Sequence, residues 1–342
     1  MRAMVVPAWG QPSELRQVAD PIARAGEAVM KVRAAGVGLT LLNMRSGRYG
    51  GETPRIMGHE LAGDIVSVGN GVTTIKTGDR CTVYFYLTCG HCRRCRGGRE
   101  TLCENFAGHV GVHRDGGFAD FVCLPAENFL TIPDALDYEA AAMAADAVNT
   151  NLHCMRERAR ISPTDRVVLI GAGGGVGIHG VQMAKLFGAH VIAVDISEDK
   201  LDLARRWGAD VTINAREVPD LVAAIKAETD GRGADAVIDY VGKSATFQAA
   251  VESLATGGRA VAIAAMPESF TFDTRRLVHG EKTITGSRHS TRAEFIETLE
   301  LMARGVIKPV VGKRAHFTEV EAIFGSIIDQ TLLGRGGLTY DA

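Results

Sequence analysis

The chain has 342 residues, 46% of them hydrophobic, and its 38 Lys and Arg nearly balance its 40 Asp and Glu. This length allows about two domains of roughly 150 residues each. The balanced charge excludes the strongly basic surface that nucleic acids or anionic membranes attract, so we expect a small-molecule partner. The N-terminus lacks an apolar leader, and no apolar run approaches the about 20 residues of a membrane span, which predicts a cytoplasmic protein.

The first 130 or so residues contain short strand-like runs. Examples are AVMKVRAAGV at 28–37, DIVSVG at 64–69 and CTVYFY at 81–86. Gly-Asn and Gly-Asp turns at 69–70 and 78–79 separate such runs. This texture predicts a compact, twisted β-barrel.

Four of the seven cysteines fall within CGHCRRCRGGRETLC at 89–103, with the spacing C-x2-C-x2-C-x7-C. Four thiolates at this spacing can enclose one tetrahedral Zn²⁺ with no open position, which predicts a structural metal site made of Cys89, Cys92, Cys95 and Cys103. A ferredoxin cluster would favour a shorter last gap and a following proline, and the alternative of unligated thiols requires the spacing to be incidental. The arginines of the loop, Arg93, Arg94, Arg96 and Arg99, would offset the negative charge of the thiolates.

From about Ser162 the pattern alternates between strands and helices. Strand-like VVLIGA at 167–172, HVIAVD at 190–195 and ADAVIDYV at 234–241 are separated by helical stretches such as VGIHGVQMAKLF at 176–187. This alternation predicts β–α units on a parallel sheet, and therefore a dinucleotide-binding domain.

The stretch RVVLIGAGGGVG at 166–177 predicts a strand, a glycine loop and the start of a helix. In this context the glycines let the backbone approach a pyrophosphate, and the helix N-terminus offers unpaired N–H groups. Asp195 lies 18 residues after Gly177, where its carboxylate can accept hydrogen bonds from both ribose hydroxyls. No arginine follows it, so we predict NAD(H) rather than NADP(H). The predicted contacts in this domain are Ala172, Gly174, Gly175, Val176, Gly177, Asp195 and Lys200.

The last 55 or so residues return to mixed structure and are too short for a third domain. We therefore expect a catalytic domain at 1–145, with 283–342 packing back on it, and a cofactor domain at 146–282.

These features together resemble the zinc-containing alcohol dehydrogenases of the medium-chain dehydrogenase/reductase superfamily. GHELAGDIVSVG at 58–69, TGDRCTVY at 77–84 and DGGFADFV at 115–122 carry the resemblance, beside the cysteine cluster and the glycine loop. It implies an α/β protein with a GroES-like β-barrel catalytic domain and a Rossmann domain with a doubly wound parallel sheet. It also implies an active site between the domains, a homodimer or homotetramer, and a second, catalytic zinc.

The chain departs from this family at the catalytic zinc. In GVGLTL at 36–41, Gly38 stands where the family has a cysteine ligand, so one donor is missing. The resemblance assigns the remaining ligand positions to His59, Glu60 and Asp146. These residues could form a harder, oxygen-rich set, which we expect to bind zinc more weakly than a set containing a thiolate.

Two further positions take their roles from the resemblance. Thr40 matches the hydroxyl that relays a proton from the substrate, and Arg335 matches an arginine that contacts the cofactor pyrophosphate. Two other features resemble the zinc-free quinone and enone reductases of the same superfamily. The glycine loop is one residue longer than in the zinc enzymes, and the segment after Gly38 ends with Arg45, Gly47 and Tyr49.

The sequence therefore predicts an NAD(H)-dependent oxidoreductase that moves a hydride between nicotinamide and a small alcohol or carbonyl compound. One alternative is metal-independent reduction of an activated C=C bond. The other is a catalytically silent NAD-binding sensor, which the retained polar residues at 59, 60 and 146 disfavour.

Overall fold

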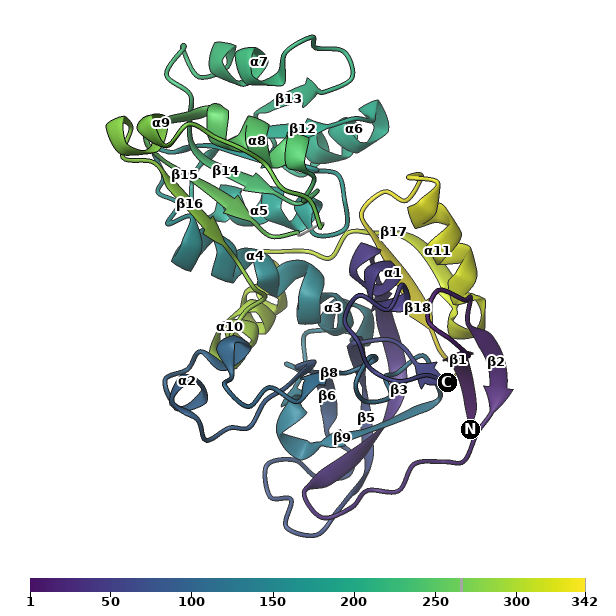
Figure 1. Cartoon of the computed structure of the whole chain (residues 1–342). Helices are drawn as coiled ribbons and strands as arrows, with labels where there is room; N and C mark the ends of the chain where they lie inside the picture. Colours follow the sequence, from purple (N-terminus) through teal and green to yellow (C-terminus); the bar gives the residue numbers. More distant parts are fainter. Residues whose placement is uncertain (265–266, 342) are drawn as a thin grey trace. The chain divides into compact units, whose positions relative to one another are not determined.

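The computed structural model describes residues 1–264 and 267–341, and Figure 1 labels most of its helices and strands. The chain divides into two compact units. Residues Met1–Ala147 and Thr291–Ala342 form the first unit, and Val148–Ser290 form the second. The chain thus leaves the first unit, builds the second, and returns to the first.

The first unit is built around the long strand β3 (Glu27–Val37). Its main sheet has the order β10 (Phe129–Thr131), β6 (Arg80–Val83), β5 (Glu60–Val68), β3, β18 (Arg335–Thr339), β17 (Val311–His316), and β9 (Phe121–Pro125) also pairs with β3. Most of β3 is buried, because it pairs antiparallel with β5, β9 and β18. This arrangement agrees with the β-rich texture predicted for the N-terminal region.

Two smaller sheets and several helices complete the first unit (Figure 1). The sheets are β2 (Glu14–Gln17), β1 (Arg2–Val6), β4 (Arg55–Ile56) and the pair β7 (Tyr86–Leu87), β8 (Gly108–His109). The helices are α1 (Leu39–Arg45), α2 (Arg93–Arg96), α3 (Tyr138–Met143), α10 (Arg292–Ala303) and α11 (Val320–Ile328). Helix α10 begins where Thr291 and Glu294 form a capping box, which satisfies N–H groups of its first turn.

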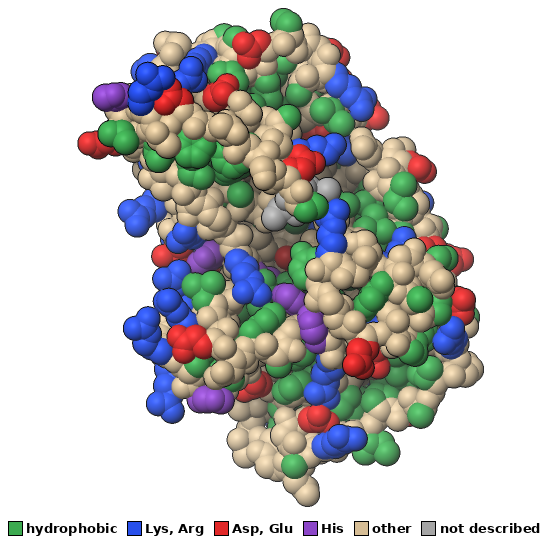
Figure 2. All heavy atoms as spheres, viewed as in Figure 1, with side chains coloured by type: hydrophobic (Ala, Val, Ile, Leu, Met, Phe, Trp, Pro, Cys, Tyr) green, Lys and Arg blue, Asp and Glu red, His purple; other side chains and the backbone are tan. Residues whose placement is uncertain are grey.

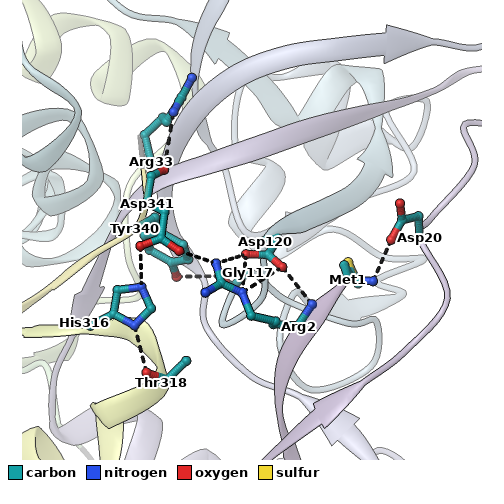
Figure 3. A network of polar contacts seen from close by, with 10 residues as sticks. All are labelled: Met1, Arg2, Asp20, Arg33, Gly117, Asp120, His316, Thr318, Tyr340 and Asp341. Carbon is teal, nitrogen blue, oxygen red and sulfur yellow. Dashed lines mark hydrogen bonds and ion pairs between the residues drawn. The ribbon is translucent and has the colours of Figure 1, made fainter.

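A network of polar contacts anchors the C-terminal residues on the first unit (Figure 3). Arg2 pairs with Asp120 at 2.6 Å and with Asp341 at 2.7 Å, and the hydroxyl of Tyr340 donates to the carbonyl oxygen of Gly117 at 2.6 Å. The ring of Tyr340 also stacks on Phe317 with centroids 4.7 Å apart. These contacts fix strand β18, which enters the sheet beside β3.

Helix α3 carries the chain towards the second unit. Asp137 caps it by accepting the N–H of Ala140 at 2.7 Å, and the helix packs on β3 and β5. A π-helical turn, Ala144–Val148, follows directly. π-Turns often occur at functional sites. Here the turn contains Asp146.

The second unit is a six-stranded parallel sheet with helices. The strand order is β13 (Val211–Asn214), β12 (His190–Asp195), β11 (Arg166–Ile170), β14 (Ala234–Asp239), β15 (Leu254–Ala262), β16 (Thr283–Gly286). Its helices are α4 (Asn149–His153), α5 (Gly177–Leu186), α6 (Glu198–Arg206), α7 (Leu221–Ala227), α8 (Ser244–Glu252) and α9 (Thr274–His279). This order, with the first strand in the middle, is that of a dinucleotide-binding sheet.

The predicted alternation of strands and helices is confirmed. Apolar residues of the central strands, including Val168, Ile192 and Val237, form the core of the unit. The expected cofactor domain was 146–282, and the compact second unit spans Val148–Ser290, so residues 283–290 lie in it. The reason is that β16 pairs in parallel with β15 and extends the sheet.

Candidate functional site

The predicted cofactor loop, residues 171–176, joins the end of β11 to the start of α5. A Cβ at Gly177 would overlap the carbonyl oxygen of Gly171, so glycine is what lets the helix start this close to the strand. A Cβ at Gly174 would meet only that same oxygen, at 3.3 Å, so this position leaves room for a phosphate beside the backbone. Ala172 is fully buried and donates its N–H to Val194.

Asp195 ends β12 beside this loop and is 7% exposed. Its Oδ2 accepts the N–H of Gly173 at 3.0 Å and its Oδ1 accepts the N–H of Ile196 at 2.8 Å. These bonds orient the carboxylate toward the glycine loop, and each oxygen keeps a lone pair for a ribose hydroxyl. Its negative charge opposes a 2′-phosphate. Lys200 is half-buried in α6, where it packs against Gly173.

The four clustered cysteines converge in the first unit. Their sulfur atoms all lie within 4.8 Å of one another, with Cys89 3.9 Å from Cys95 and 3.5 Å from Cys103. A tetrahedron with Zn–S bonds of about 2.3 Å has edges of about 3.8 Å, so these spacings suit zinc. Backbone N–H groups of Cys92, Cys95 and Cys89 point at the sulfurs of Cys89, Cys92 and Cys103, each at 3.4 Å.

These backbone N–H groups stabilise the ionised, thiolate form of the cysteines over the neutral thiol. Desolvation opposes ionisation of Cys89, but the surrounding donors outweigh it and lower the pKa of this thiol to about 6. Burial and neighbouring thiols instead raise the pKa of Cys95 to about 12. Without a cation the four sulfurs cannot all ionise together, because adjacent thiolates repel one another. The donor set therefore fits a structural Zn²⁺, as the spacing predicts, and all seven cysteines are free thiols.

A second cluster joins His59, Glu60 and Asp146, the three predicted ligand positions. Their donor atoms lie within 4.8 Å of one another, and all three side chains are buried. His59 Nε2 is 3.5 Å from Asp146 Oδ2 and 3.8 Å from Glu60 Oε1. Neither ring nitrogen of His59 has a hydrogen-bond partner among the described residues, and the ring packs at a tilt against Phe85 with centroids 4.3 Å apart. The structure thus brings together three residues that lie up to 87 positions apart in the chain.

Arg335 completes this cluster. It is 1% exposed, and its guanidinium pairs closely with Glu60 and lies 3.3 Å from Asp146 Oδ2. Burial lowers its pKa to about 9, so it is still a cation at neutral pH, and the two carboxylates favour that charge. The sequence resemblance assigned Arg335 to the cofactor pyrophosphate, and that role stays a prediction.

By type and spacing, the three side chains could ligate a catalytic metal ion. Because the guanidinium of Arg335 already lies against both carboxylates, an added divalent ion would lie beside a second cation. The cluster as it stands therefore does not fit a metal.

Thr40, the predicted proton relay, is half-buried in the first turn of α1, two residues after Gly38. The position of Gly38 is informative, since its backbone is extended and a Cβ there would overlap the guanidinium of Arg335.

Comparison with known proteins agrees with these features. The model of the alcohol dehydrogenase GroES-like domain matches residues 24–134, and the model of the zinc-binding dehydrogenase matches residues 175–304. An alcohol dehydrogenase of Geobacillus stearothermophilus is 34% identical, with 100% of both chains covered. The chain belongs to the zinc-binding alcohol dehydrogenase family.

Other relatives show similar identity over nearly the whole chain. An NAD-dependent alcohol dehydrogenase of Sulfurisphaera tokodaii is 32% identical over 98% of this chain and 99% of its own. An acryloyl-coenzyme A reductase of Metallosphaera sedula is 31% identical over 99% of this chain and 100% of its own. The crystal structure of the alcohol dehydrogenase from Aeropyrum pernix has a TM-score of 0.92 and 29% identity, covering 99% of this chain and 100% of that one.

The family relation confirms the predicted fold class, a GroES-like domain with a Rossmann-like parallel sheet, and the predicted enzyme class. The chain is an NAD-dependent oxidoreductase of the alcohol dehydrogenase type. Its cysteine cluster matches the zinc dependence of the family.

Sequence reasoning did not single out Gly36, which packs directly against the second cluster. Gly36 pairs with Glu60 across the sheet, and a Cβ at Gly36 would overlap the carboxylate of Glu60. In the sequence, Gly36 is marked only by its spacing from Gly38. Residues two apart in an extended segment face the same side, so the two glycines open space on one face.

Proposed function

We propose that the chain exchanges a hydride between NAD(H) and a small alcohol or carbonyl compound. The observation that carries this proposal is the placement of Asp195 beside a glycine loop in a chain of the alcohol dehydrogenase family. Several relatives bear the name NAD-dependent alcohol dehydrogenase, which supports both the cofactor and the substrate class.

In this proposal the first unit is the catalytic domain and the second binds the cofactor. Asp195 accepts the ribose hydroxyls, while the N-terminal turn of α5 and the room at Gly174 receive the pyrophosphate. Thr40 passes the proton that accompanies hydride transfer to or from oxygen. His59 and Glu60 are buried in the first unit, next to Asp146.

A second candidate is the reduction of a C=C bond activated by a carbonyl group. The observation that favours it is the guanidinium of Arg335 among the carboxylates, since this chemistry needs no metal at that position. The similarity to an acryloyl-coenzyme A reductase supports the same reading. Hydride would then add to the β-carbon and a proton to the α-carbon.

One substrate can separate the two candidates. We would incubate the protein with NADH and 2-cyclohexen-1-one, which offers both bonds, and identify the product by gas chromatography. Formation of 2-cyclohexen-1-ol supports carbonyl chemistry, and formation of cyclohexanone supports C=C reduction. A parallel assay would test primary and secondary alcohols with NAD⁺. Absence of hydride transfer with all alcohols, aldehydes, ketones and enones tested, with either NADH or NADPH, would refute both and favour a silent sensor.

We also propose a cytoplasmic homodimer or homotetramer. Clustered thiols that hold a metal are typical of a reducing compartment, which supports the cytoplasmic location.

No helix among the described residues is long and apolar enough to cross a bilayer. Lys and Arg are interspersed with Asp and Glu on the face shown in Figure 2, which agrees with a small-molecule substrate rather than a nucleic acid. Light scattering coupled to gel filtration measures the mass, and a monomer would contradict the proposed assembly.

A further inference from the structure

The guanidinium of Arg335 uses the same oxygen atoms that a metal ion would use. Its Nη2 contacts Glu60 Oε1 and lies 3.3 Å from Asp146 Oδ2. These two oxygens are also the ones that approach Nε2 of His59, at 3.8 Å and 3.5 Å. Nη2 of Arg335 therefore contacts the same two carboxylate oxygens that would bind a metal ion together with His59.

The strand beside this cluster is shaped for the guanidinium. Gly36 and Gly38 lie two residues apart in the AAGVG segment at 34–38, and neither has a side chain. A Cβ at Gly36 would overlap the carboxylate of Glu60, and a Cβ at Gly38 would overlap the guanidinium of Arg335. A cysteine at position 38 would therefore compete with Arg335 for space. The glycine at position 38, where the family has a cysteine ligand, is thus what makes room for the guanidinium of Arg335.

The charges of the cluster agree with this arrangement. Glu60 is fully buried and Asp146 is 7% exposed, so each carboxylate needs a positive partner. The single cation of Arg335 lies within ion-pair distance of both and is shared between them. A guanidinium cannot leave the protein, and unlike zinc it has no vacant coordination position for a substrate oxygen.

We infer that Arg335 is the resident cation of the His59–Glu60–Asp146 cluster and excludes a divalent metal ion from it. It follows that the protein holds one zinc per chain, in the cysteine cluster. This inference concerns metal content and does not depend on which substrate the enzyme uses.

The test is the zinc content per chain after expression with zinc and gel filtration, measured by elemental analysis. The native protein is expected to hold one zinc. Arg335→Met removes the cation and frees both carboxylates, so the content should rise to two. Adding His59→Ala to that variant should return it to one, which places the second ion at this cluster. Cys103→Ser in the native chain should lower the content below one and serves as the control for the cysteine site.

Two results would overturn the inference. One is a native protein with two zincs, of which one is lost in His59→Ala. The other is an Arg335→Met variant that still holds one zinc. Should Arg335→Met not fold, Arg335→Gln gives the same reading with a polar side chain. Because the readout is zinc and not turnover, failure of the proposed substrate class would leave this result unchanged.

Discussion

The contact between Gly38 and Arg335 can be tested by adding one methyl group. In Gly38→Ala the new Cβ would overlap the guanidinium, which must then shift from its present position against Glu60. Position 38 has an extended backbone that alanine adopts without strain, so any cost comes from this contact. The variant thus isolates the packing of the arginine from backbone effects.

The magnitude follows from two limits. Overpacking a well-filled site costs about 1–3 kcal/mol, and full separation of a buried ion pair costs about 3–5 kcal/mol. Because the guanidinium lies at the end of a flexible side chain, we expect a partial displacement and a cost of about 2 kcal/mol. For a domain of this size that lowers Tm by about 4–8 °C.

The assay is thermal unfolding followed by circular dichroism, with zinc content measured on the same samples. Gly325→Ala is the matched control, since this glycine lies in α11 with no neighbouring atom within 4 Å of its added Cβ. A helix-interior alanine should stabilise by about 0.5–1 kcal/mol. Each variant is also made in the Arg335→Met background, where Gly38→Ala should cost at least about 1 kcal/mol less. An equal cost in both backgrounds would refute the contact as the cause.

Further outcomes follow from other parts of the chain. Burial lowers the pKa of His179 to about 4 in the folded protein. As the pH falls, the unfolded chain therefore binds a proton at this histidine before the folded chain does. The free energy of unfolding should drop by up to about 3 kcal/mol between about pH 6.5 and pH 4. His179→Gln should remove that slope in pH-dependent urea unfolding, and an unchanged slope would contradict it. Asp195→Asn keeps an acceptor for Gly173 but loses the charge, so the KM for NADH should rise about tenfold and the preference over NADPH should narrow; steady-state kinetics with both cofactors would expose an unaltered ratio. In Gly177→Ala the Cβ would overlap the Gly171 carbonyl, so cofactor affinity by fluorescence titration should fall more than in Gly174→Ala, where the nearest atom is 3.3 Å away. Equal affinities in these two would argue against the distinct roles given to the glycines.

The local patterns of this sequence were sufficient to predict the cofactor fold and the cysteine cluster. Both features depend on residues close in the chain. The glycine loop and Asp195 lie within one β–α–β unit, and four cysteines within 15 residues must meet if the loop closes on an ion. The resemblance to the family added the candidate residues at 59, 60 and 146, and the structure places their donor atoms together.

The tertiary structure alone decided which cation pairs with that second cluster. Arg335 lies 275 residues from Glu60 in the chain, and only the pairing of β18 with β3 and of β3 with β5 brings them together. From the sequence, Gly38 was a missing ligand, which says what the site lacks. The fold shows that the guanidinium of Arg335 occupies this space instead. Whether a buried carboxylate faces a metal or a guanidinium depends on side-chain packing across three strands. Local sequence patterns do not encode that packing.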